Sequence, residues 1–416
     1  MKLLTVFHRF LRSAFTKCTN RTSTKIGILT CLVFSLYVFV MYIPDFQKEI
    51  TPLVHPFSKT LKFLRSNGAV HPDDLGVMEG MSHEEKLKAM FSLREGIHQI
   101  FNECLTSSKY DHCSSPQANN VINDQPILTL FTTWIYDEDK FFINNNTLYN
   151  WRKLSGVNLV VFTNDAKVKY YSKKAGWSVL PILTTVAGDA PVLKQMFHTV
   201  QQQFKTDFYG YSNGDLLFEE GLYKTLQKIA CQMNETIRTK PILIVGKRTN
   251  IDAEILNSGV VSSGQKMQEY AMSFGNLFHA DALDFFITNT VFPWQDFLPL
   301  AIGRRGYDNW VVSVARYHNS TVIDVTDSVL ALHQTLRERG NFEGLNKPFN
   351  NYNLDMIASQ DISIRYGLWG QTHCAEWQTW YDMCGRVTLT RRKNIKSDCF
   401  LKKTFFQRLF DFREPL

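Results

Sequence analysis

Residues 208–218 read FYGYSNGDLLF and carry the pattern that decides the expected fold. The apolar run 208–211 predicts a short buried strand. The strand is followed by Asn213-Gly214-Asp215, a polar turn in which glycine allows a close approach of the backbone, and then by a second apolar run. The stretch therefore predicts a strand end that presents one carboxylate and one carboxamide.

Outward from this stretch, apolar strands alternate with helical segments. Strands are expected at 127–131, 157–162 and 242–245, with a weaker one at 177–183 that Pro181 interrupts. Helices are expected at 191–204, with Pro191 at the first position, and at 222–233. This alternation is typical of an α/β fold with a mixed, mainly parallel sheet flanked by helices.

Polar residues follow four of these strands. In chain order they are Thr132 and Thr133, then Asn164 and Asp165, then Asn213 and Asp215, and finally the loop 246–250. Sheets of this kind bind ligands outside the carboxyl ends of their strands, so these residues are candidates for a binding site. Asp, Asn, Ser and Gly also favour turns, which remains the alternative explanation at any single strand end.

The turn at 213–215 has the chemistry of a divalent metal site. Mg²⁺ or Mn²⁺ bound to a diphosphate prefers oxygen ligands and usually takes one or two protein carboxylates. Asp215 offers one carboxylate, and the Asn213 amide can hydrogen-bond a ribose hydroxyl or a metal-bound water. The sequence thus predicts a divalent cation, Mn²⁺ or Mg²⁺, as cofactor.

On these residues the chain resembles the Golgi-type, type II membrane glycosyltransferases of the GT-A fold. That superfamily has a Rossmann-like catalytic domain with an Asp-x-Asp metal motif at a strand end. Residues 209–218 have that form, except that Asn213 stands where the first Asp is expected. The resemblance covers about residues 127–335 and implies an enzyme that transfers a sugar from a nucleotide diphosphate donor to a hydroxyl acceptor.

The same resemblance implies roles for residues outside the turn. Thr132, Thr133 and Asp165 would bind the nucleotide sugar together with Asn213. Lys194, on the helix before the 208–211 strand, would meet the diphosphate, although a solvated helix face is the alternative. Asp215 would serve the catalytic step through the metal.

Residues 303–310, GRRGYDNW, predict a glycine-flanked loop at the start of the helix 310–315. Asp308 is a candidate general base for the acceptor hydroxyl, and it is equally a candidate N-cap of that helix. Arg304 or Arg305 is a candidate to neutralise the leaving diphosphate. The loop 246–248, Gly-Lys-Arg, is the alternative phosphate-binding element.

A late histidine, His333, would complete the metal site by the same resemblance, with a purely structural histidine as the alternative. Asp281 and Asp284 are expected to shape an acceptor pocket. Nearby aromatic residues either stack on a sugar or pack in the core, and core packing is favoured; they are Phe285, Phe286, Phe292 and Trp294.

The N-terminal region predicts a membrane anchor. The formal net charge is +7, and Lys2, Arg9, Arg12, Lys17, Arg21 and Lys25 account for most of it. The rest of the chain is close to neutral, which argues against a nucleic-acid-binding protein. The following run 26–43 has no charge and no proline, so we expect an uncleaved transmembrane helix rather than a signal peptide. The positive-inside rule then gives a type II topology.

These features define the expected domains. They are a basic cytosolic tail (1–25), the anchor (26–43), a luminal stem (44–124) with an amphipathic helix near 82–105, the catalytic domain (125–340) and a C-terminal aromatic cap (341–416). Six luminal cysteines favour disulfides over zinc. Their spacing suggests the pairs Cys104–Cys113 and Cys374–Cys384. The sequons at Asn145, Asn234 and Asn319 predict glycosylation.

The sequence thus favours a luminal glycosyltransferase in the membrane of the Golgi, or of the endoplasmic reticulum. Its expected partners are a nucleotide-sugar donor, a glycan, protein or lipid acceptor, and the membrane itself. The alternative is a carbohydrate-binding membrane protein or pseudoenzyme with the same fold, which Asn213 supports. A sulfotransferase is disfavoured, because no basic phosphate loop follows the first strand.

Overall fold

The computed structural model describes residues 125–336, 346–359, 370–382 and 384–399. Two compact units divide the chain, one of 116–380 with 387–416 and the other of 1–115 with 381–386. In the second unit the described residues form a turn, in which the Asp382 carboxylate accepts hydrogen bonds from the backbone N–H groups of Cys384 and Arg386, both at 2.9 Å. All other described residues except Tyr381 belong to the first unit.

A nine-stranded sheet forms the centre of this unit, in the order β15-β14-β12-β8-β11-β6-β1-β2-β3. Strands β1, β2, β3 and β6 are parallel, as are β8, β12 and β14, whereas β11 is antiparallel to its neighbours β6 and β8. The fold is therefore mixed α/β and Rossmann-like with a mainly parallel sheet, as predicted. The strands are β1 (Leu128–Thr133), β2 (Val157–Phe162), β3 (Ser178–Leu180), β6 (Phe208–Ser212), β8 (Ile242–Val245), β11 (Phe285–Asn289), β12 (Thr321–Asp327), β14 (Trp377–Tyr381) and β15 (Val387–Arg391).

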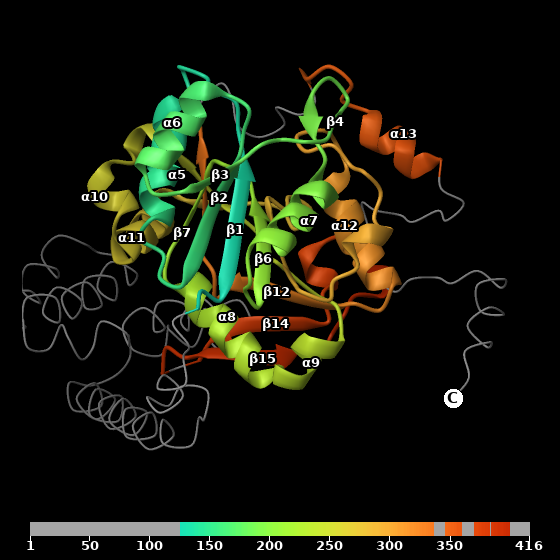
Figure 1. Ribbon diagram of the computed structural model, residues 1–416. Helices are drawn as coiled ribbons and strands as arrows, with labels where there is room; N and C mark the ends of the chain where they lie inside the picture. Colours follow the sequence, from blue (N-terminus) through green and yellow to red (C-terminus); the bar gives the residue numbers. More distant parts are fainter. Residues whose placement is uncertain (1–124, 337–345, 360–369, 383, 400–416) are drawn as a thin grey trace, which may run out of the picture. The chain divides into compact units, whose positions relative to one another are not determined.

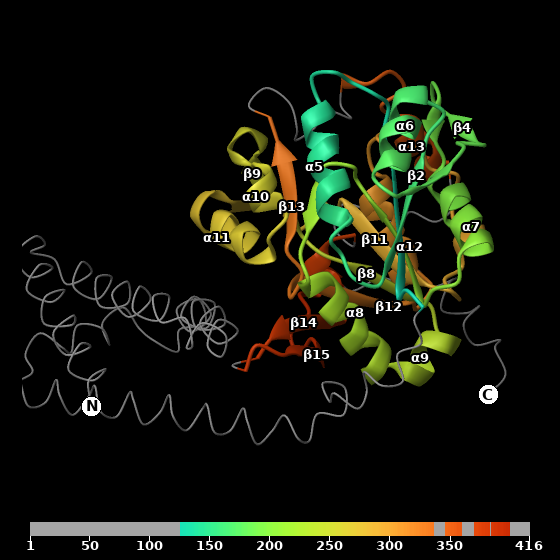
Figure 2. The same ribbon diagram turned by 60° about the vertical axis from the view of Figure 1, so that its left-hand side comes forward.

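Helices cover both faces of the sheet, as Figures 1 and 2 show from two directions. Helices α7 and α12 pack on one face, and α5, α6 and α8 pack on the other. Alternate strand residues serve the two faces; in β1, Phe131 faces α7, whereas Leu130 faces α5. The helices are α5 (Phe141–Trp151), α6 (Ala166–Lys174), α7 (Leu193–Gln203), α8 (Gly221–Gln232), α9 (Asn234–Thr239), α10 (Ser258–Val261), α11 (Gly264–Phe274), α12 (Tyr307–Tyr317) and α13 (Tyr352–Ala358).

A smaller four-stranded sheet has the order β10-β9-β13-β7. Its strand β7 (Leu216–Phe218) leaves the Asn213-Gly214-Asp215 turn and pairs antiparallel with β13 (Ala331–Thr335). Strand β13 also pairs in parallel with β9 (Thr249–Asp252), and β10 (Asn276–Leu277) forms the edge. This sheet is what brings residues 330–335 beside the turn. A separate two-stranded sheet joins β4 (Thr185–Val186) to β5 (Ala190–Pro191).

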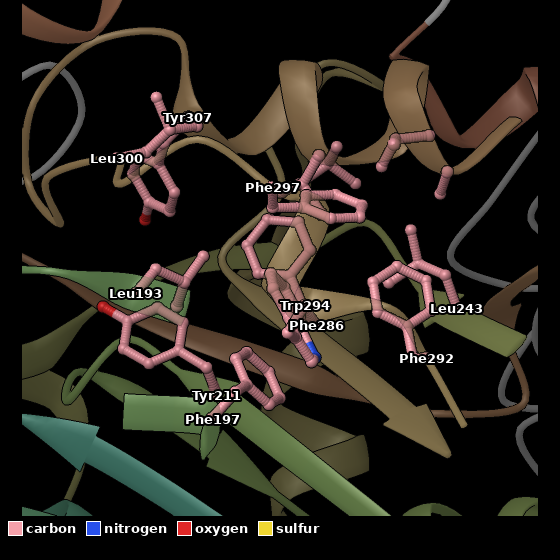
Figure 3. Packing of buried hydrophobic residues seen from close by; sticks show 14 of the residues in the cluster. Leu193, Phe197, Tyr211, Leu243, Phe286, Phe292, Trp294, Phe297, Leu300 and Tyr307 are labelled. Atoms are coloured by element: carbon pink, nitrogen blue, oxygen red, sulfur yellow. The ribbon is translucent and has the colours of Figure 1, made fainter. Parts of the chain in front are cut away.

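The aromatic residues near 285–297 pack in the core. Phe286, Phe292 and Trp294 are at most 3% exposed and belong to the cluster beneath α7 and α12, where Trp294 stacks on Phe197 at 3.9 Å between ring centroids. Figure 3 shows this cluster, with Tyr211 and Tyr307 at its edge. Phe285 is equally buried, on the opposite face. The favoured interpretation of these residues as core is confirmed.

Two local predictions were wrong. Pro191 is not the first residue of the helix; it lies in β5, and Val192 is the N-cap of α7. Cys374 does not pair with Cys384: its disulfide partner is Cys399, with 5.2 Å between Cα atoms, and Cys384 is in another disulfide. The reason is tertiary, because two short 3₁₀ turns, η6 (Thr372–Cys374) and η7 (Ser397–Cys399), meet across the chain.

Other predictions fall outside the described residues. They are the anchor at 26–43, the stem helix at 82–105 and the pair Cys104–Cys113. None of the helices that the structure describes is both long and apolar enough to cross a membrane. The segment predicted as a C-terminal cap contributes β14 and β15 to the central sheet.

Candidate functional site

The connection order of the sheet marks one place for a ligand. The chain runs outward from β1 to β2 and β3, then returns to β6 on the other side of β1. In open α/β sheets this reversal leaves a crevice beyond the carboxyl ends of the strands, where ligands bind. The registers place those ends in one row, because Thr133 pairs with Phe162 and Phe131 pairs with Tyr211. Thr132, Thr133 and the 213–215 turn therefore meet at the switch point.

The turn itself is held by its backbone. Thr147 donates a hydrogen bond to the Gly214 carbonyl at 2.8 Å, and the Gln334 backbone N–H donates to the Asp215 carbonyl at 3.1 Å. A Cβ atom at 214 would lie 2.6 Å from the Trp134 ring and 3.3 Å from Thr132 Oγ1, so glycine is the residue that fits there without a shift of the Trp134 ring. The Asp215 side chain is thereby fixed at the switch point.

Asp215 and His333 form a pair. His333 Nε2 lies 3.3 Å from Asp215 Oδ2, and His333 is almost fully buried. On the other side of the ring, His333 Nδ1 is 3.0 Å from the side-chain oxygen of Asn250, which β9 places directly beside it. With that oxygen as acceptor, Nδ1 carries a proton and Nε2 faces the Asp215 carboxylate, to which it donates when the ring is protonated; a metal bound by Nε2 would take the place of that second proton.

The ionisation state of Asp215 suits the binding of a cation. Burial raises the pKa of Asp215, but His333 and Arg248 more than offset burial, so the pKa lies below its usual value. The carboxylate is therefore ionised at neutral pH. Among the described residues, no hydrogen-bond partner is found for its buried Oδ1 atom. A similar observation holds for Thr132, whose buried Oγ1 has no partner in the described part of the chain.

These atoms fit a divalent cation. Two ligand atoms at about 2.1 Å from a cation, on adjacent octahedral positions, lie about 3 Å apart, close to the observed Asp215–His333 separation. A carboxylate with an imidazole suits a transition ion such as Mn²⁺ better than Mg²⁺, which prefers oxygen alone. The one group of three metal-binding residue types within the described ranges is His373 with Cys374 and Cys399, whose two sulfurs are bonded to each other.

Asn213 faces a different network. Its side-chain nitrogen donates to Asp284 Oδ1 at 2.9 Å, and its side-chain oxygen accepts from the Tyr211 hydroxyl at 2.9 Å and from the Tyr307 hydroxyl at 3.4 Å. Burial raises the pKa of both tyrosines well above the usual value, so both hydroxyls remain protonated donors. The amide expected to contact ribose or a metal-bound water is thus occupied within the protein.

A buried ion pair completes this network. Arg248 and Asp284 are each 7% exposed and are bonded to each other through Arg248 Nη1 and Asp284 Oδ2. The Arg248 guanidinium also lies over the Phe278 ring, 4.7 Å from its centroid. Asp284 therefore binds an arginine on one oxygen and Asn213 on the other. This arrangement explains why residue 213 is an amide, because a second carboxylate would face Asp284.

Asp308 is placed on α12 but does not cap it. The N-cap is Gly306, in the left-handed region with φ of 85°, and no side chain caps the helix. The N-cap alternative for Asp308 is therefore wrong. Burial, together with the charge of Asp284, raises the pKa of Asp308 to about 7, against the opposing effect of nearby backbone N–H groups. At neutral pH this carboxyl can both accept and release a proton.

Two predicted residues have structural partners elsewhere. Asp165 is the N-cap of α6 and accepts hydrogen bonds from the N–H groups of Lys167 and Val168, so its turn role is observed. The Lys194 ammonium donates to the carbonyls of Phe297 and Gln295, at 2.7 and 3.4 Å.

Arg304 is likewise tied elsewhere. It is buried and donates to the carbonyl of Ala187, in the loop between β4 and β5, at 2.8 Å. No contact of Arg304 or Lys194 with the Asp215–His333 pair is found in the described ranges. The exposed asparagines Asn145, Asn234 and Asn319 place all three sequons at the surface.

Sequence reasoning missed the residues that support the site. They are Arg248, Asn250, Thr147, Gln334 and the tyrosines Tyr211 and Tyr307. The loop 246–250 and Asp284 are both candidates from the sequence, but nothing in their spacing indicates that Arg248 meets Asp284. Asn250 is found beside His333 only because β9 and β13 are neighbours.

Comparisons with known proteins give slight likenesses. Neither a protein-family model nor a curated protein sequence matches the chain. Among solved structures, TarS from S. aureus in complex with UDP-GlcNAc is 14% identical, with a TM-score of 0.22 over 31% of this chain and 36% of that one. The mannosyltransferase PcManGT from Pyrobaculum calidifontis, in complex with GDP-Man and Mn²⁺, is 11% identical, with a TM-score of 0.21 over 28% and 35%. Likenesses this slight assign neither a family nor an activity to the chain.

Proposed function

We propose that the protein is a nucleotide-sugar-dependent glycosyltransferase of the GT-A fold, with its active site at the carboxyl ends of β1 and β6. The observation that carries the proposal is the Asp215–His333 pair at the switch point of the sheet, with 3.3 Å between carboxylate oxygen and imidazole nitrogen. The Asp215 carboxylate is ionised, and its second oxygen, Oδ1, is buried and has no hydrogen-bond partner in the described part of the chain.

On the donor side, Asp215 and His333 are the residues that would hold a divalent cation. A bound cation supplies positive charge that stabilises the departing diphosphate. Asn250 holds the His333 ring so that Nε2 faces the site. Thr132 and Thr133 lie at the same strand end and are the proposed contacts to the nucleotide sugar.

On the acceptor side, Asp308 is the proposed general base. It takes the proton of the acceptor hydroxyl while the oxygen forms a bond to the anomeric carbon, and the bond from that carbon to the nucleoside diphosphate breaks. A pKa of about 7 suits this role, because an effective base titrates near the working pH. Asp284 raises that pKa through its charge, and Arg248 fixes Asp284 in place.

The proposed location is the membrane of the Golgi or of the endoplasmic reticulum, with the catalytic domain in the lumen. The uncharged run 26–43 and the basic segment before it support a type II anchor. The Cys374–Cys399 disulfide supports an oxidising compartment. The exposed positions of Asn145, Asn234 and Asn319 are compatible with glycosylation.

A carbohydrate-binding protein without transferase activity is the second candidate. The observation in its favour is Asn213, which lacks the carboxylate of the Asp-x-Asp motif. Its side-chain amide is hydrogen-bonded to Asp284, Tyr211 and Tyr307. Such a protein would bind a nucleotide sugar or a glycan and release no product.

The test is product formation. The purified full-length protein is incubated with a panel of nucleotide sugars and Mn²⁺, and release of nucleoside diphosphate is followed. We expect release from one donor, reduced by a factor on the order of 100 or more in Asp215→Asn. Asp207→Asn is the matched control, because Asp207 is exposed and precedes the amino end of β6, remote from the switch point. Equal release by wild type and Asp215→Asn would reject the proposed site, and donor binding without any release would favour the second candidate.

A further inference from the structure

A second polar cluster lies next to the acceptor side of the site and has no role in the mechanism above. It consists of Lys247, His373, Arg392 and Lys396 next to the carboxylates of Asp324 and Asp327, and we call these four basic residues the basic cluster. Lys247 follows β8, Asp324 is on β12, His373 is in η6, and the other two follow β15. Four separate segments therefore converge on it.

Hydrogen bonds fix the centre of the basic cluster. Arg392 Nη2 is 2.9 Å from Asp324 Oδ2, and Arg392 Nη1 donates to the His373 carbonyl at 3.3 Å. Thr326 donates to the other oxygen of Asp324 through its backbone N–H and its hydroxyl, and accepts from the Lys247 backbone N–H at 2.9 Å. Asp324 is thus satisfied by Arg392 and Thr326.

Positive charge is in excess around His373. Burial lowers the pKa of His373, and the neighbouring charges of Lys396, Arg392 and Lys247 lower it further, against the single opposing effect of Asp324. Asp324 is already paired with Arg392. Lys247 is half-buried and Lys396 is exposed. The charge of Asp327 also acts on Asp324, so three cations, Lys247, Arg392 and Lys396, stand against two carboxylates and positive charge remains in excess.

Two connections place the basic cluster beside Asp308. The segment that carries His373 bonds to the start of α12, because Asn309 Nδ2 donates to the Gly370 carbonyl at 3.0 Å and to the Asp281 carbonyl at 2.8 Å. The Thr372 backbone N–H donates to the Ala280 carbonyl at 3.0 Å. On the other side, Lys247 is the chain neighbour of Arg248, which binds Asp284.

We propose that the basic cluster is a subsite for an anionic group on the acceptor sugar, so that the acceptor is a glycan carrying a carboxylate or a sulfate. The proposal rests on the proposed function, since it is Asp308 that makes this side the acceptor side. Lys247 and Lys396 attract the anion, and Arg392, held by Asp324, fixes the position of the His373 segment beside Asp308. The cluster would select the acceptor and take no part in bond cleavage.

The test compares matched sugars that differ by one anionic group. The full-length protein is titrated, with saturation-transfer NMR as readout, with methyl β-glucuronide against methyl β-glucoside and with methyl galactoside 3-sulfate against methyl galactoside. The first pair probes a carboxylate and the second a sulfate. We expect the anionic member of at least one pair to bind more tightly, with the preference falling between about 0.05 M and about 0.5 M salt.

Charge variants locate the preference. Lys247→Gln and Lys396→Gln should each weaken binding of the anionic sugar by about twofold to fivefold, the range of a solvent-accessible ion pair. Lys393→Gln is the matched control, because Lys393 is exposed in the same loop and does not act on His373. Binding of the neutral sugars should be unchanged in all three variants.

Equal binding of anionic and neutral sugars by the wild type would overturn the inference, as would a preference that both lysine variants retain. Release of nucleoside diphosphate from a nucleotide sugar, measured separately without acceptor, keeps the two proposals apart. Release with equal binding of both sugars would reject the subsite and retain the transferase. A lysine-dependent anionic preference without release from any donor would support the anion site and reject the transferase.

Discussion

The two ends of the Asn213-Gly214-Asp215 turn differ in whether their polar side-chain atoms already have hydrogen-bond partners within the protein. Asp215 faces His333 with an ionised carboxylate, one oxygen of which is buried and has no hydrogen-bond partner among the described residues. Two residues earlier, Asn213 is bonded on both atoms of its amide, to Asp284 on one side and to two tyrosine hydroxyls on the other. One side is open to a ligand, and the other is closed by the protein itself.

This difference indicates that Asp215 and Asn213, at the two ends of the turn, have separate roles. The open end supplies ligand atoms. The closed end ties the turn to Asp284, which directly precedes β11, and to α12, which carries Tyr307 and Asp308. Arg248 is common to both, because it neutralises Asp284 directly and lowers the pKa of Asp215 through its charge. Three changes test this division.

The largest effect is expected from Arg248→Gln. The substitution leaves Asp284 buried without its ion-pair partner, which should lower the free energy of unfolding by about 3–5 kcal/mol. Urea denaturation of wild type and variant measures the loss. The double variant Arg248→Met with Asp284→Leu removes both charges and should recover a large part of it. A loss within 1 kcal/mol, on the order of a surface ion pair, would show that the closed side does not depend on this pair.

A smaller effect is expected from Asn213→Asp, which restores the Asp-x-Asp motif. The new carboxylate loses the hydrogen bond to Asp284 and faces that carboxylate instead, so stability should fall by about 1–3 kcal/mol. Denaturation at neutral pH is the measurement, with Asp207→Asn as control. A stabilised or more active variant would mean that the closed side is in fact a vacant second metal-binding position.

The third effect is spread over a range of pH, and it comes from Asp308. Its pKa in the folded protein, about 7, lies above the ordinary carboxyl value of 3.8. The folded state therefore holds this proton more tightly, so the contribution to stability is complete at low pH and is lost as the pH rises toward 7. Asp308→Asn should lose less stability than wild type between pH 5 and pH 8, as measured by urea denaturation.

The same group predicts the opposite trend for activity. A general base must be ionised, so turnover by the wild type should rise with pH through a midpoint near 7. Turnover that is independent of pH between 5 and 8 would remove Asp308 from the proposed role.

Much of the fold could be predicted because it depends on local patterns. The runs 157–162 and 242–245 became β2 and β8 with the expected bounds, and 208–211 became β6 with one further residue. Strand β8 is buried throughout, and its sequence is continuously apolar; β2 is apolar apart from Asn158, and its second half is buried. The short strands outside the central sheet could not be predicted. Pro191 lies in β5 because β5 pairs with β4, and no local sequence pattern indicates this pairing.

The sequence pattern predicts the part of the site that lies at strand ends. Thr132 is the penultimate residue of β1, and Asn213 and Asp215 follow β6, so the parallel registers bring them together. His333 lies within β13 and is expected only from the family resemblance. Asp284 and Arg248 are 36 residues apart and meet through the antiparallel strand β11. Likewise, Cys374 pairs with Cys399 through two separate 3₁₀ turns. Contacts of this kind depend on tertiary packing, which sequence spacing does not report.

The central claim is that Asp215 and His333 together hold a divalent cation, and calorimetric titration of Mn²⁺ into the full-length protein with UDP or GDP present tests it most directly. We predict saturable binding by the wild type and by Asp207→Asn, and a loss of affinity on the order of tenfold or more in both Asp215→Asn and His333→Gln. Wild-type Mn²⁺ affinity in Asp215→Asn would contradict the claim and place any metal elsewhere in the molecule.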